Sequence, residues 1–378
     1  MNQNHERITV KEVDLHITRE CDNHCGYCYV APNNTELQTV VNRCGPLCGD
    51  TVKLKSVITK IHDVAGAEDL VFVGGDPCKH PDLVSLLEHA KSVGLNTCVL
   101  SNTHTYAKCG TYYDIAKVAR SNIVDELDFT LHGSSAEMHD AFTKRKGSYE
   151  LATSSLKRFI TVRKNEQPVG IVLNMVPDIV RDLPNVMKNI IGEIGMMPGI
   201  DFFTIQRVAP SGMALEEYSK WKLTPSLLEY AFEVFEEIKA KYGFETKCCI
   251  DAFPWCSVPE KYWKYLEPLE GGCNWGKPNG VLSALMDGKL QRCALCQSTL
   301  EVNILDMTPE SFTETMLNHP LLVAVNERRH LDDKCLNCKL LDRCGGGCIV
   351  SAGAESGDPY FYEKGEVTVR KGHDYLAK

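Results

Sequence analysis

Short runs of β-branched and aromatic residues alternate with longer amphipathic stretches from residue 12 to about 210. Such runs predict strands, and they occupy 13–18, 70–75, 96–102, 126–133, 170–176 and 201–208. Stretches in which apolar residues recur at helical spacing predict helices, and the clearest are 81–94, 148–164 and 182–195. Because strands alternate with helices, we expect an α/β fold with a parallel sheet, a partial (β/α)6 TIM-like barrel.

The chain changes character after this barrel. Residues 223–243 predict one long helix that ends at Gly243. Beyond residue 245 the apolar periodicity fades and Cys, Gly and Pro dominate. A segment of this kind usually needs metal to hold it together. We therefore expect a barrel domain over 1–220, a bridging helix over 221–244 and a loop-rich C-terminal cluster-binding domain over 245–378.

Composition narrows the partners and the location. The formal net charge is −9 and no Lys/Arg block occurs, which argues against nucleic acid as the main partner. No apolar run is long enough for a membrane span. The opening "MNQNHERITV" lacks the apolar core of a signal peptide. We expect a cytoplasmic protein that acts on neither nucleic acid nor a membrane.

The chain carries 18 cysteines, far more than an ordinary cytoplasmic enzyme. They concentrate in 21–48 and 248–348, and none occurs between 110 and 247. Disulfides are a poor explanation in a reducing compartment, and metal binding is the better one. Two separate metal-bearing regions are implied.

Cys21, Cys25 and Cys28 form the first region, in the loop after the first predicted strand. A structural zinc knuckle is one interpretation, but zinc takes four ligands and no fourth is locally spaced. Three thiolates instead suit a cluster that keeps one metal position open. The loop "HITRECDNHCGYCYV" closely resembles that of the radical S-adenosylmethionine (radical SAM) family.

This resemblance implies a cofactor and a reaction. In the family, three cysteines bind a 4Fe–4S cluster whose fourth iron chelates the methionine part of S-adenosylmethionine. One electron, from a donor such as flavodoxin or ferredoxin, cleaves the cosubstrate to methionine and a 5′-deoxyadenosyl radical. That radical removes hydrogen from an unactivated carbon. Tyr27 matches the aromatic residue that lies near the adenine.

Further candidate residues for binding S-adenosylmethionine follow the predicted strands. The stretch "GGDPCKHP" resembles the family's Gly-Gly-Glu-Pro motif with Asp in place of Glu, and its members are Gly74, Gly75, Asp76 and Pro77. Paired glycines let a backbone approach a ligand closely, although a plain turn is the alternative. Polar residues at strand ends suit ribose hydroxyls and a carboxylate, or serve only as loop hydrogen-bonders. They are Ser101, Asn102, Thr130, Asn174, Gln206 and Arg207.

The stretch "FTLHGSSAEMHDAFTKRKGSYE" resembles a pattern of family members that carry auxiliary clusters. His132 stands where Asp is common in that pattern. We expect His139 and Asp140 to pin the segment that follows rather than to do chemistry.

The C-terminal cysteines resemble the auxiliary-cluster extension called SPASM, which usually holds two 4Fe–4S clusters. Two zinc sites are the alternative. The resemblance implies that Cys273, Cys293 and Cys348 bind an inner auxiliary cluster. It implies an outer auxiliary cluster on Cys335, Cys338 and Cys344.

Each auxiliary set is one ligand short, because the seventh family cysteine, expected after Cys348, is absent. We assign Cys256 to the inner cluster, and Cys296 competes for that role. Asp358, His373 or an open iron would complete the outer cluster. The remaining thiols are expected to be buried or reduced, and they are Cys44, Cys48, Cys78, Cys98, Cys109, Cys248 and Cys249.

Three hypotheses for the function remain open, and no residue is identified as a catalytic acid or base. Many SPASM enzymes are maturases of ribosomally synthesised peptides, which is the hypothesis we favour. Only about eleven residues precede the first strand, so no leader-binding domain is expected, which weakens it. "IQRVAPSGMA" and "CGGGC" are similar to haem-pathway members and favour a tetrapyrrole or another small molecule. A non-catalytic iron–sulfur electron carrier is the third alternative.

Overall fold

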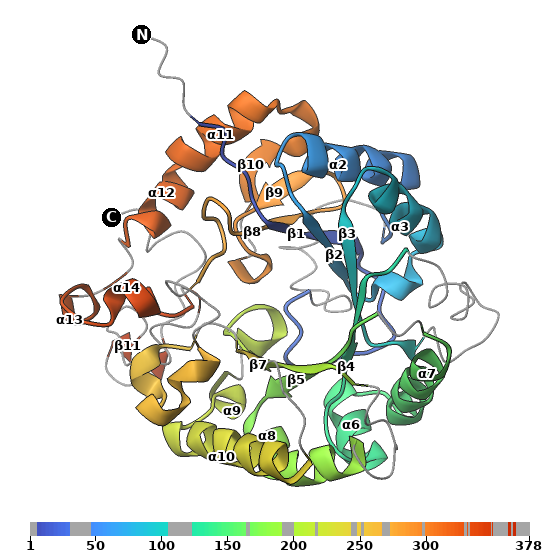
Figure 1. Ribbon diagram of the computed structural model, residues 1–378, viewed down its shortest axis with the longest axis vertical. Helices are drawn as coiled ribbons and strands as arrows, with labels where there is room; N and C mark the ends of the chain where they lie inside the picture. The colour runs from blue at the N-terminus through green and yellow to red at the C-terminus, as the bar shows by residue number, and fades with distance from the viewer. Residues whose placement is uncertain are drawn as a thin grey trace.

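The computed structural model describes most of the chain. The residues described are 6–30, 47–104, 123–163, 167–190, 200–215, 218–242, 248–250, 253–266, 273–296, 299–328, 331, 333–348, 350, 362–363 and 366–367. Strands occupy the centre and helices surround them in a ring (Figure 1).

Six strands at the predicted positions build the barrel. They are β1 (Glu12–Thr18), β2 (Asp69–Gly74), β3 (Asn96–Ser101), β4 (Glu126–Thr130), β5 (Val169–Met175) and β6 (Phe202–Arg207). Each pairs in parallel with the next, which confirms the predicted parallel sheet. Val13, Leu15 and Ile17 of β1 are fully buried on the outer side of the sheet, whereas the alternate residues face the barrel interior.

Amphipathic helices cover the outside of these strands. They are α2 (Thr51–Asp63), α3 (Leu83–Ser92), α6 (Ala136–Thr143), α7 (Ser148–Val162), α8 (Pro177–Lys188) and, near the barrel end, α10 (Pro225–Tyr242). The helices predicted at 81–94, 148–164 and 223–243 are confirmed. The one predicted at 182–195 begins earlier, because Pro177 suits the first turn of a helix. Helix α2 escaped prediction, although Leu54, Ile58 and Ile61 follow helical spacing.

The C-terminal region is more regular than its sequence suggested. It contains β7 (Cys248–Ile250), β8 (Val281–Ala284), β9 (Lys289–Gln291), β10 (Thr299–Asn303), α11 (Pro309–Asn318) and α12 (Pro320–Asn326). These strands extend the barrel sheet to ten strands in the order β10-β9-β8-β1-β2-β3-β4-β5-β6-β7. Strand β8 pairs in parallel with β1, so the C-terminal region adds to the barrel sheet itself.

The remaining described elements are short. They are η1 (Pro77–Lys79), η3 (Gly212–Leu215), α9 (Tyr218–Trp221), η4 (Trp255–Ser257), η5 (Glu260–Tyr265), η6 (Ala294–Cys296), η7 (Ile304–Asp306), α13 (Asp333–Leu336), α14 (Leu341–Cys344), β11 (Tyr362–Glu363) and β12 (Glu366–Val367). One apolar core runs from barrel residues such as Phe72 and Phe203 to Phe312 of α11 and Leu322 of α12. Among the described residues, no helix combines the length and apolar character of a membrane span.

Candidate functional site

A cavity of about 270 Å³ lies at the carboxyl ends of the barrel strands. It brings together residues that the sequence analysis drew from the barrel and from the C-terminal region. Those that line it are Cys21, Cys25, Tyr27, Cys28, Gly74, Gly75, Ser101, Asn102, Thr130, Asn174, Gln206, Arg207, Cys273, Cys293 and Cys348. Chemistry in a barrel of this kind sits at the strand ends, where these residues meet.

Two glycines at the end of β2 hold the cysteine loop. The Gly75 N–H donates to Thr18 O at 2.8 Å, and the Asp76 N–H donates to Glu20 O at 2.7 Å. A Cβ on Gly75 would lie 2.3 Å from Glu20 O, so a side chain there would collide with the loop backbone. The close approach that the glycines permit is therefore to the cysteine loop as well as to the cavity.

The hydrogen bonds that Cys21 of the cysteine loop accepts come from neutral groups. Cys21 Sγ accepts hydrogen bonds from the Asn23 N–H and from Asn102 Nδ2, each at 3.4 Å. Burial raises the pKa of the Cys25 thiol to about 12, and the neighbouring Cys28 adds to the effect. Because metal binding displaces these protons, ligation by the loop releases protons at neutral pH.

Zinc and a 4Fe–4S cluster need different spacings of the thiols. Zn–S bonds of about 2.3 Å place the sulfurs of a tetrahedral zinc site roughly 3.8 Å apart. Within the described residues, the one group of three potential ligands with donor atoms mutually within 4.8 Å is Cys98, Glu126 and Asp128. None of the predicted cysteine sets among the described residues meets that limit. In a 4Fe–4S cluster each thiolate would bind a different iron.

Tyr27 and His132 form an uncharged wall of the cavity. The Tyr27 hydroxyl lies 2.8 Å from His132 Nε2 and accepts from Asn174 Nδ2 at 3.2 Å. Burial, helped by His139 and His104, lowers the pKa of His132 well below its usual value. The backbone N–H of His132 donates to His139 Nδ1 at 3.0 Å. A neutral imidazole therefore positions the phenol beside the cysteine loop.

Asp140 pins the start of α7, as the sequence predicted. Its carboxylate accepts from the Ser148 hydroxyl and the Tyr149 N–H, both at 2.9 Å. Hydrogen bonds from these groups hold the pKa of the Asp140 carboxyl below its usual value, although burial opposes them.

Asp76 and Pro77 do not line the cavity. The Asp76 carboxylate accepts from Ser101 Oγ at 2.7 Å and from the Cys78 N–H at 3.1 Å. Ser101 Oγ also accepts from the Thr103 N–H at 2.8 Å. Asp76 is fully buried, and burial raises its pKa. It shapes the end of β3 from behind the cavity wall.

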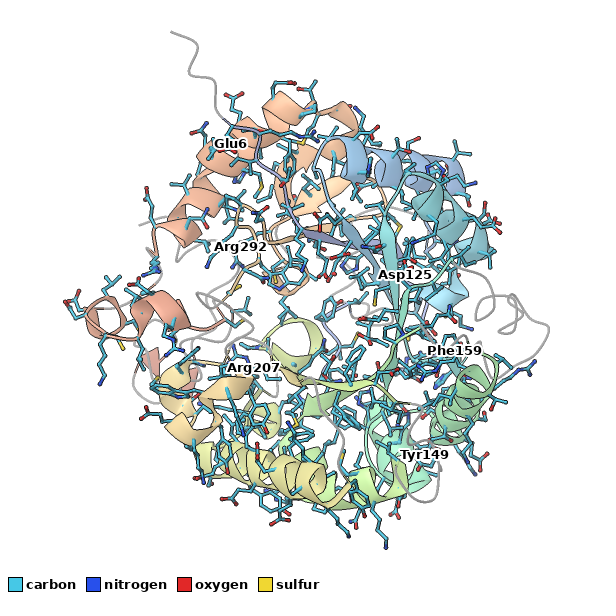
Figure 2. The ribbon with its side chains drawn as sticks, viewed as in Figure 1. Glu6, Asp125, Tyr149, Phe159, Arg207 and Arg292 are labelled. Carbon is cyan, nitrogen blue, oxygen red and sulfur yellow. The ribbon has the colours of Figure 1, made fainter. Side chains whose placement is uncertain are left out.

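Arg207 and Arg292 are buried cations in the cavity wall. Figure 2 labels both, with Arg292 above Arg207 in this view. The Arg207 guanidinium lies over the Phe253 ring, 4.9 Å from its centre. Arg292 was not predicted from the sequence, although it directly precedes Cys293. The other lining residues that it missed include Asp14, Asn23, Tyr29, Asn274 and Trp275.

The auxiliary cysteines fall into two places. Cys273, Cys293 and Cys348 line the cavity, whereas Cys335, Cys338 and Cys344 do not. Cys344 Sγ accepts from the Trp255 N–H at 3.4 Å. The next residue is Cys256, which is exposed and does not line the cavity. The chain therefore brings Cys256 toward the outer set rather than the inner one.

Other cysteines lie outside the cavity wall. Cys78 is fully buried, as expected, and Cys48 Sγ lies 3.1 Å from Thr18 Oγ1. The remaining predictions concern Cys44, Cys109, Asp358 and His373 and the side chains of Cys248, Cys249 and Cys296, which are outside the described residues.

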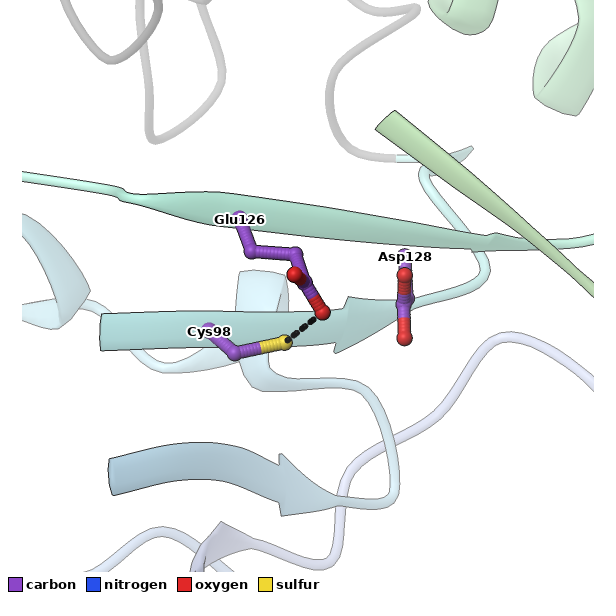
Figure 3. A group of neighbouring side chains, drawn as sticks. All are labelled: Cys98, Glu126 and Asp128. Carbon is purple, nitrogen blue, oxygen red and sulfur yellow. Dashed lines mark hydrogen bonds between the residues drawn. The ribbon is translucent and has the colours of Figure 1, made fainter. Parts of the chain in front are cut away.

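A second group of side chains occupies the barrel floor, below the cavity. Figure 3 shows Cys98 of β3 beside Glu126 and Asp128 of β4, with Cys98 Sγ 3.8 Å from Glu126 Oε1. Burial and the neighbouring carboxylates raise the pKa of Asp128 to about 8. They also raise the pKa of Glu12, which faces the same interior from β1, to about 7.

Comparison with known proteins agrees with this geometry. Residues 15–188 match the family model of the Radical SAM superfamily. The chain is 23% identical over 359 residues to the Fe-coproporphyrin III synthase of Methanosarcina barkeri, covering 90% of this chain and 84% of the relative. It is 24% identical over 351 residues to a PqqA peptide cyclase of Methylorubrum extorquens, covering 90% of this chain and 81% of that relative.

Two solved structures share the fold. Streptococcus suis SuiB bound to the precursor peptide SuiA matches with a TM-score of 0.66 and 16% identity, covering 91% of this chain and 72% of SuiB. The enzyme anSMEcpe with bound AdoMet and Cp18Cys peptide matches with a TM-score of 0.62 and 16% identity, covering 97% and 94%. The cysteine loop, the strand-end cavity and the family match agree: residues 15–188 form a Radical SAM domain, and the chain is a radical SAM enzyme.

Proposed function

We propose that this enzyme modifies a ribosomally synthesised peptide, using S-adenosylmethionine and three 4Fe–4S clusters. The observation that carries the proposal is that the loop thiols and the inner auxiliary thiols line one cavity. A substrate held there lies between both sets. When bound, the loop cluster supplies the electron that cleaves S-adenosylmethionine to the radical that abstracts hydrogen.

The residues of the cavity divide the work of binding. Cys21, Cys25 and Cys28 hold the loop cluster, and the backbone beside Gly74 and Gly75 accepts from the methionine ammonium. Tyr27, fixed by His132 and Asn174, presents its ring near the adenine. The other strand-end groups receive the ribose and the carboxylate, and they are Ser101, Asn102, Thr130, Gln206 and Arg207. Apolar neighbours such as Val73, Leu100 and Val172 keep water out of the same space.

We assign Cys256 to the outer auxiliary cluster, with Cys335, Cys338 and Cys344. The contact between the Trp255 N–H and Cys344 Sγ favours this over the inner assignment. Replacing Cys256 with Ala should disturb the outer cluster and leave the inner one intact. Iron should fall toward the level of a Cys335→Ala/Cys338→Ala variant, whereas a Cys48→Ala control should keep the wild-type count. If combining Cys256→Ala with Cys335→Ala/Cys338→Ala removes more iron than the double variant alone, the assignment is wrong.

A peptide is favoured by three similar proteins: a PqqA peptide cyclase, SuiB bound to the precursor peptide SuiA, and anSMEcpe bound to the Cp18Cys peptide. A tetrapyrrole is the second candidate. Two buried arginines, Arg207 and Arg292, line the cavity and suit a small molecule that carries several carboxylates. The similarity to an Fe-coproporphyrin III synthase agrees with that choice.

The test is anaerobic reconstitution of the full chain, followed by an assay for 5′-deoxyadenosine with reduced flavodoxin or ferredoxin as electron donor. Three clusters predict about twelve irons per chain. A Cys21→Ala/Cys25→Ala/Cys28→Ala variant should lose about four irons and all cleavage. Undiminished cleavage in that variant contradicts the radical SAM site, and cleavage absent from wild type favours an electron carrier.

Substrate class is tested in the same assay. Short Cys-, Ser- or Thr-rich peptides encoded beside this gene are compared with Fe-coproporphyrin III. The peptide should increase 5′-deoxyadenosine formation and gain or lose mass in the same reaction. Stimulation by the tetrapyrrole alone overturns the peptide proposal and supports the second candidate.

A further inference from the structure

Arg292 is a charged side chain in the interior of the protein. Its side chain is only 1% exposed and is the largest of the fully buried ones among the described residues. The aliphatic part lies over Gly276, where a Cβ would come within 2.6 Å of Arg292 Cγ. The glycine leaves room for the arginine chain, which fixes the direction of the guanidinium.

The guanidinium points at a predicted cluster ligand. Arg292 Nη2 donates to Cys273 Sγ at 3.3 Å. A neutral thiol is a weak acceptor, whereas a thiolate bound to iron carries negative charge. Burying a guanidinium is costly unless an anion compensates it. This donor therefore fits a cluster thiolate at Cys273 better than a free thiol.

More positive charge gathers on the same side of Cys273. A second cavity, of about 70 Å³, is lined by Cys273 together with Lys277, Arg292 and Arg328. Burial lowers the pKa of Lys277, and the neighbouring Arg328 and Arg292 lower it further, whereas Cys273 raises it. An anion at Cys273 would relieve the repulsion among the three cations.

The other predicted clusters receive different donors. Cys21 accepts from the Asn23 N–H and an Asn102 amide, and Cys344 accepts from the Trp255 N–H. All of these donors are neutral. The hydrogen bond to Cys273 comes from a full charge in a buried site, where electrostatic interactions are stronger than in water.

We propose that Arg292 is a positioning residue that raises the reduction potential of the inner auxiliary cluster and so prepares that cluster to accept an electron. The proposal rests on the proposed function, since it requires Cys273, Cys293 and Cys348 to hold a cluster. Reduction adds one negative charge to a cluster, and a nearby cation stabilises the reduced form. The charge and the hydrogen bond of Arg292 act in the same direction.

The experiment measures the potential directly. The full chain is reconstituted anaerobically in a Cys21→Ala/Cys25→Ala/Cys28→Ala background, so that EPR reports the auxiliary clusters without the loop cluster. The signal that Cys273→Ala removes is the inner one. Arg292→Gln should make its midpoint potential more negative by at least a tenfold change in the reduction equilibrium, about 59 mV for one electron. Arg292→Lys keeps the charge, so its midpoint potential should lie between those of wild type and Arg292→Gln.

The matched control is Arg328→Gln, which removes a cation from the same small cavity. Arg328 pairs with Asp342 at 3.3 Å, and its side chain is 32% exposed, so its charge is partly screened. Arg328→Gln should shift the midpoint potential of the inner cluster by less than half as much as Arg292→Gln does. If Arg292→Gln loses the cluster, Arg292→Lys decides by the same measurement.

The outcomes separate the two proposals. A normal iron count with equal potentials in wild type, Arg292→Gln and Arg292→Lys overturns the role of Arg292 and leaves the ligand assignment intact. If Arg328→Gln shifts the midpoint potential as much as Arg292→Gln does, the role of Arg292 is also overturned. Any nearby positive charge would then have the same effect as the hydrogen-bonded one. An iron count and an EPR spectrum that Cys273→Ala leaves unchanged overturn the cluster site itself.

Discussion

The mouth and the floor of the barrel are built from the same strands and carry different chemistry. At the mouth, β3 and β4 end in Ser101 and Thr130, beside thiols, neutral hydrogen-bonding groups and the charged side chains of Asp14, Arg207 and Arg292. On the floor, the inward residues of the same strands are Cys98, Glu126 and Asp128. The mouth suits a cofactor that brings its own charge, whereas the floor concentrates carboxyl groups that hold protons near neutral pH.

One barrel can support a redox site because the two ends of its strands carry different groups. The hydrogen bonds that Cys21 of the cysteine loop accepts come from amides. On the floor, the raised pKa values of Glu12 and Asp128 cost stability as the pH rises. Mutations at the mouth should therefore change cofactor binding, and mutations on the floor should change how the stability of the fold depends on pH.

The largest effect is expected at the mouth, from Gly75→Val. The new side chain would collide with Glu20 O and Arg19 O, so the cysteine loop must move. We expect loss of about four irons, no S-adenosylmethionine cleavage, and destabilisation on the order of 3 kcal/mol. Iron analysis and denaturant unfolding measure both.

The control for Gly75→Val is Gly147→Ala. Gly147 has a conformation that favours glycine, with φ +81°, but a Cβ there meets no atom within 4 Å. This variant should keep its iron. Full iron in Gly75→Val would show that the β2 glycines do not hold the cysteine loop.

A smaller effect is expected on the floor, from Asp128→Asn. A carboxyl whose pKa is raised in the folded state binds its proton more tightly when folded than when unfolded. The contribution of Asp128 to the free energy of unfolding is therefore present at low pH. It is lost as the pH rises from about 4, the unfolded-state pKa, toward the folded-state pKa of about 8. At pH 8 the variant should be more stable than wild type, by on the order of 2 kcal/mol after allowing for solvent.

Denaturant midpoints measured from pH 5 to pH 8.5 check this. Asp128→Asn and Glu12→Gln should each flatten the decline in stability that wild type shows over that range. Glu314→Gln, at an exposed position on α11, should leave the decline unchanged. A wild type whose stability does not fall over this range contradicts the acidic floor.

The smallest effect is expected from Tyr27→Phe, which keeps the ring and removes the hydrogen bonds to His132 and Asn174. Loss of a hydrogen bond worth about 1 kcal/mol should weaken S-adenosylmethionine binding roughly fivefold. Equilibrium dialysis with labelled cosubstrate measures the affinity, and iron content should stay at the wild-type level. Binding as tight as wild type would remove Tyr27 from the binding wall.

The sequence revealed the barrel because its strands and helices are long enough to show their periods. It did not reveal β8, whose four residues Val281–Ala284 are all buried and therefore do not alternate. The cysteine loop was readable because its spacing is local. The contact between Arg292 and Cys273 was not, because it depends on how Gly276 and Arg292 pack. Likewise, Asp76 belongs to a recognisable motif, but only the fold shows that it faces Ser101.

The pairing of β8 with β1 bears on how this protein can be divided. Glu12 to Leu15 of β1 are registered against Val281 to Ala284 of β8. A fragment ending near residue 245 would keep the cysteine loop but leave this side of β1 as an open edge. Exposed edges of buried, apolar strands recruit other chains. The isolated barrel should therefore self-associate, and soluble fragments of this enzyme must include β8.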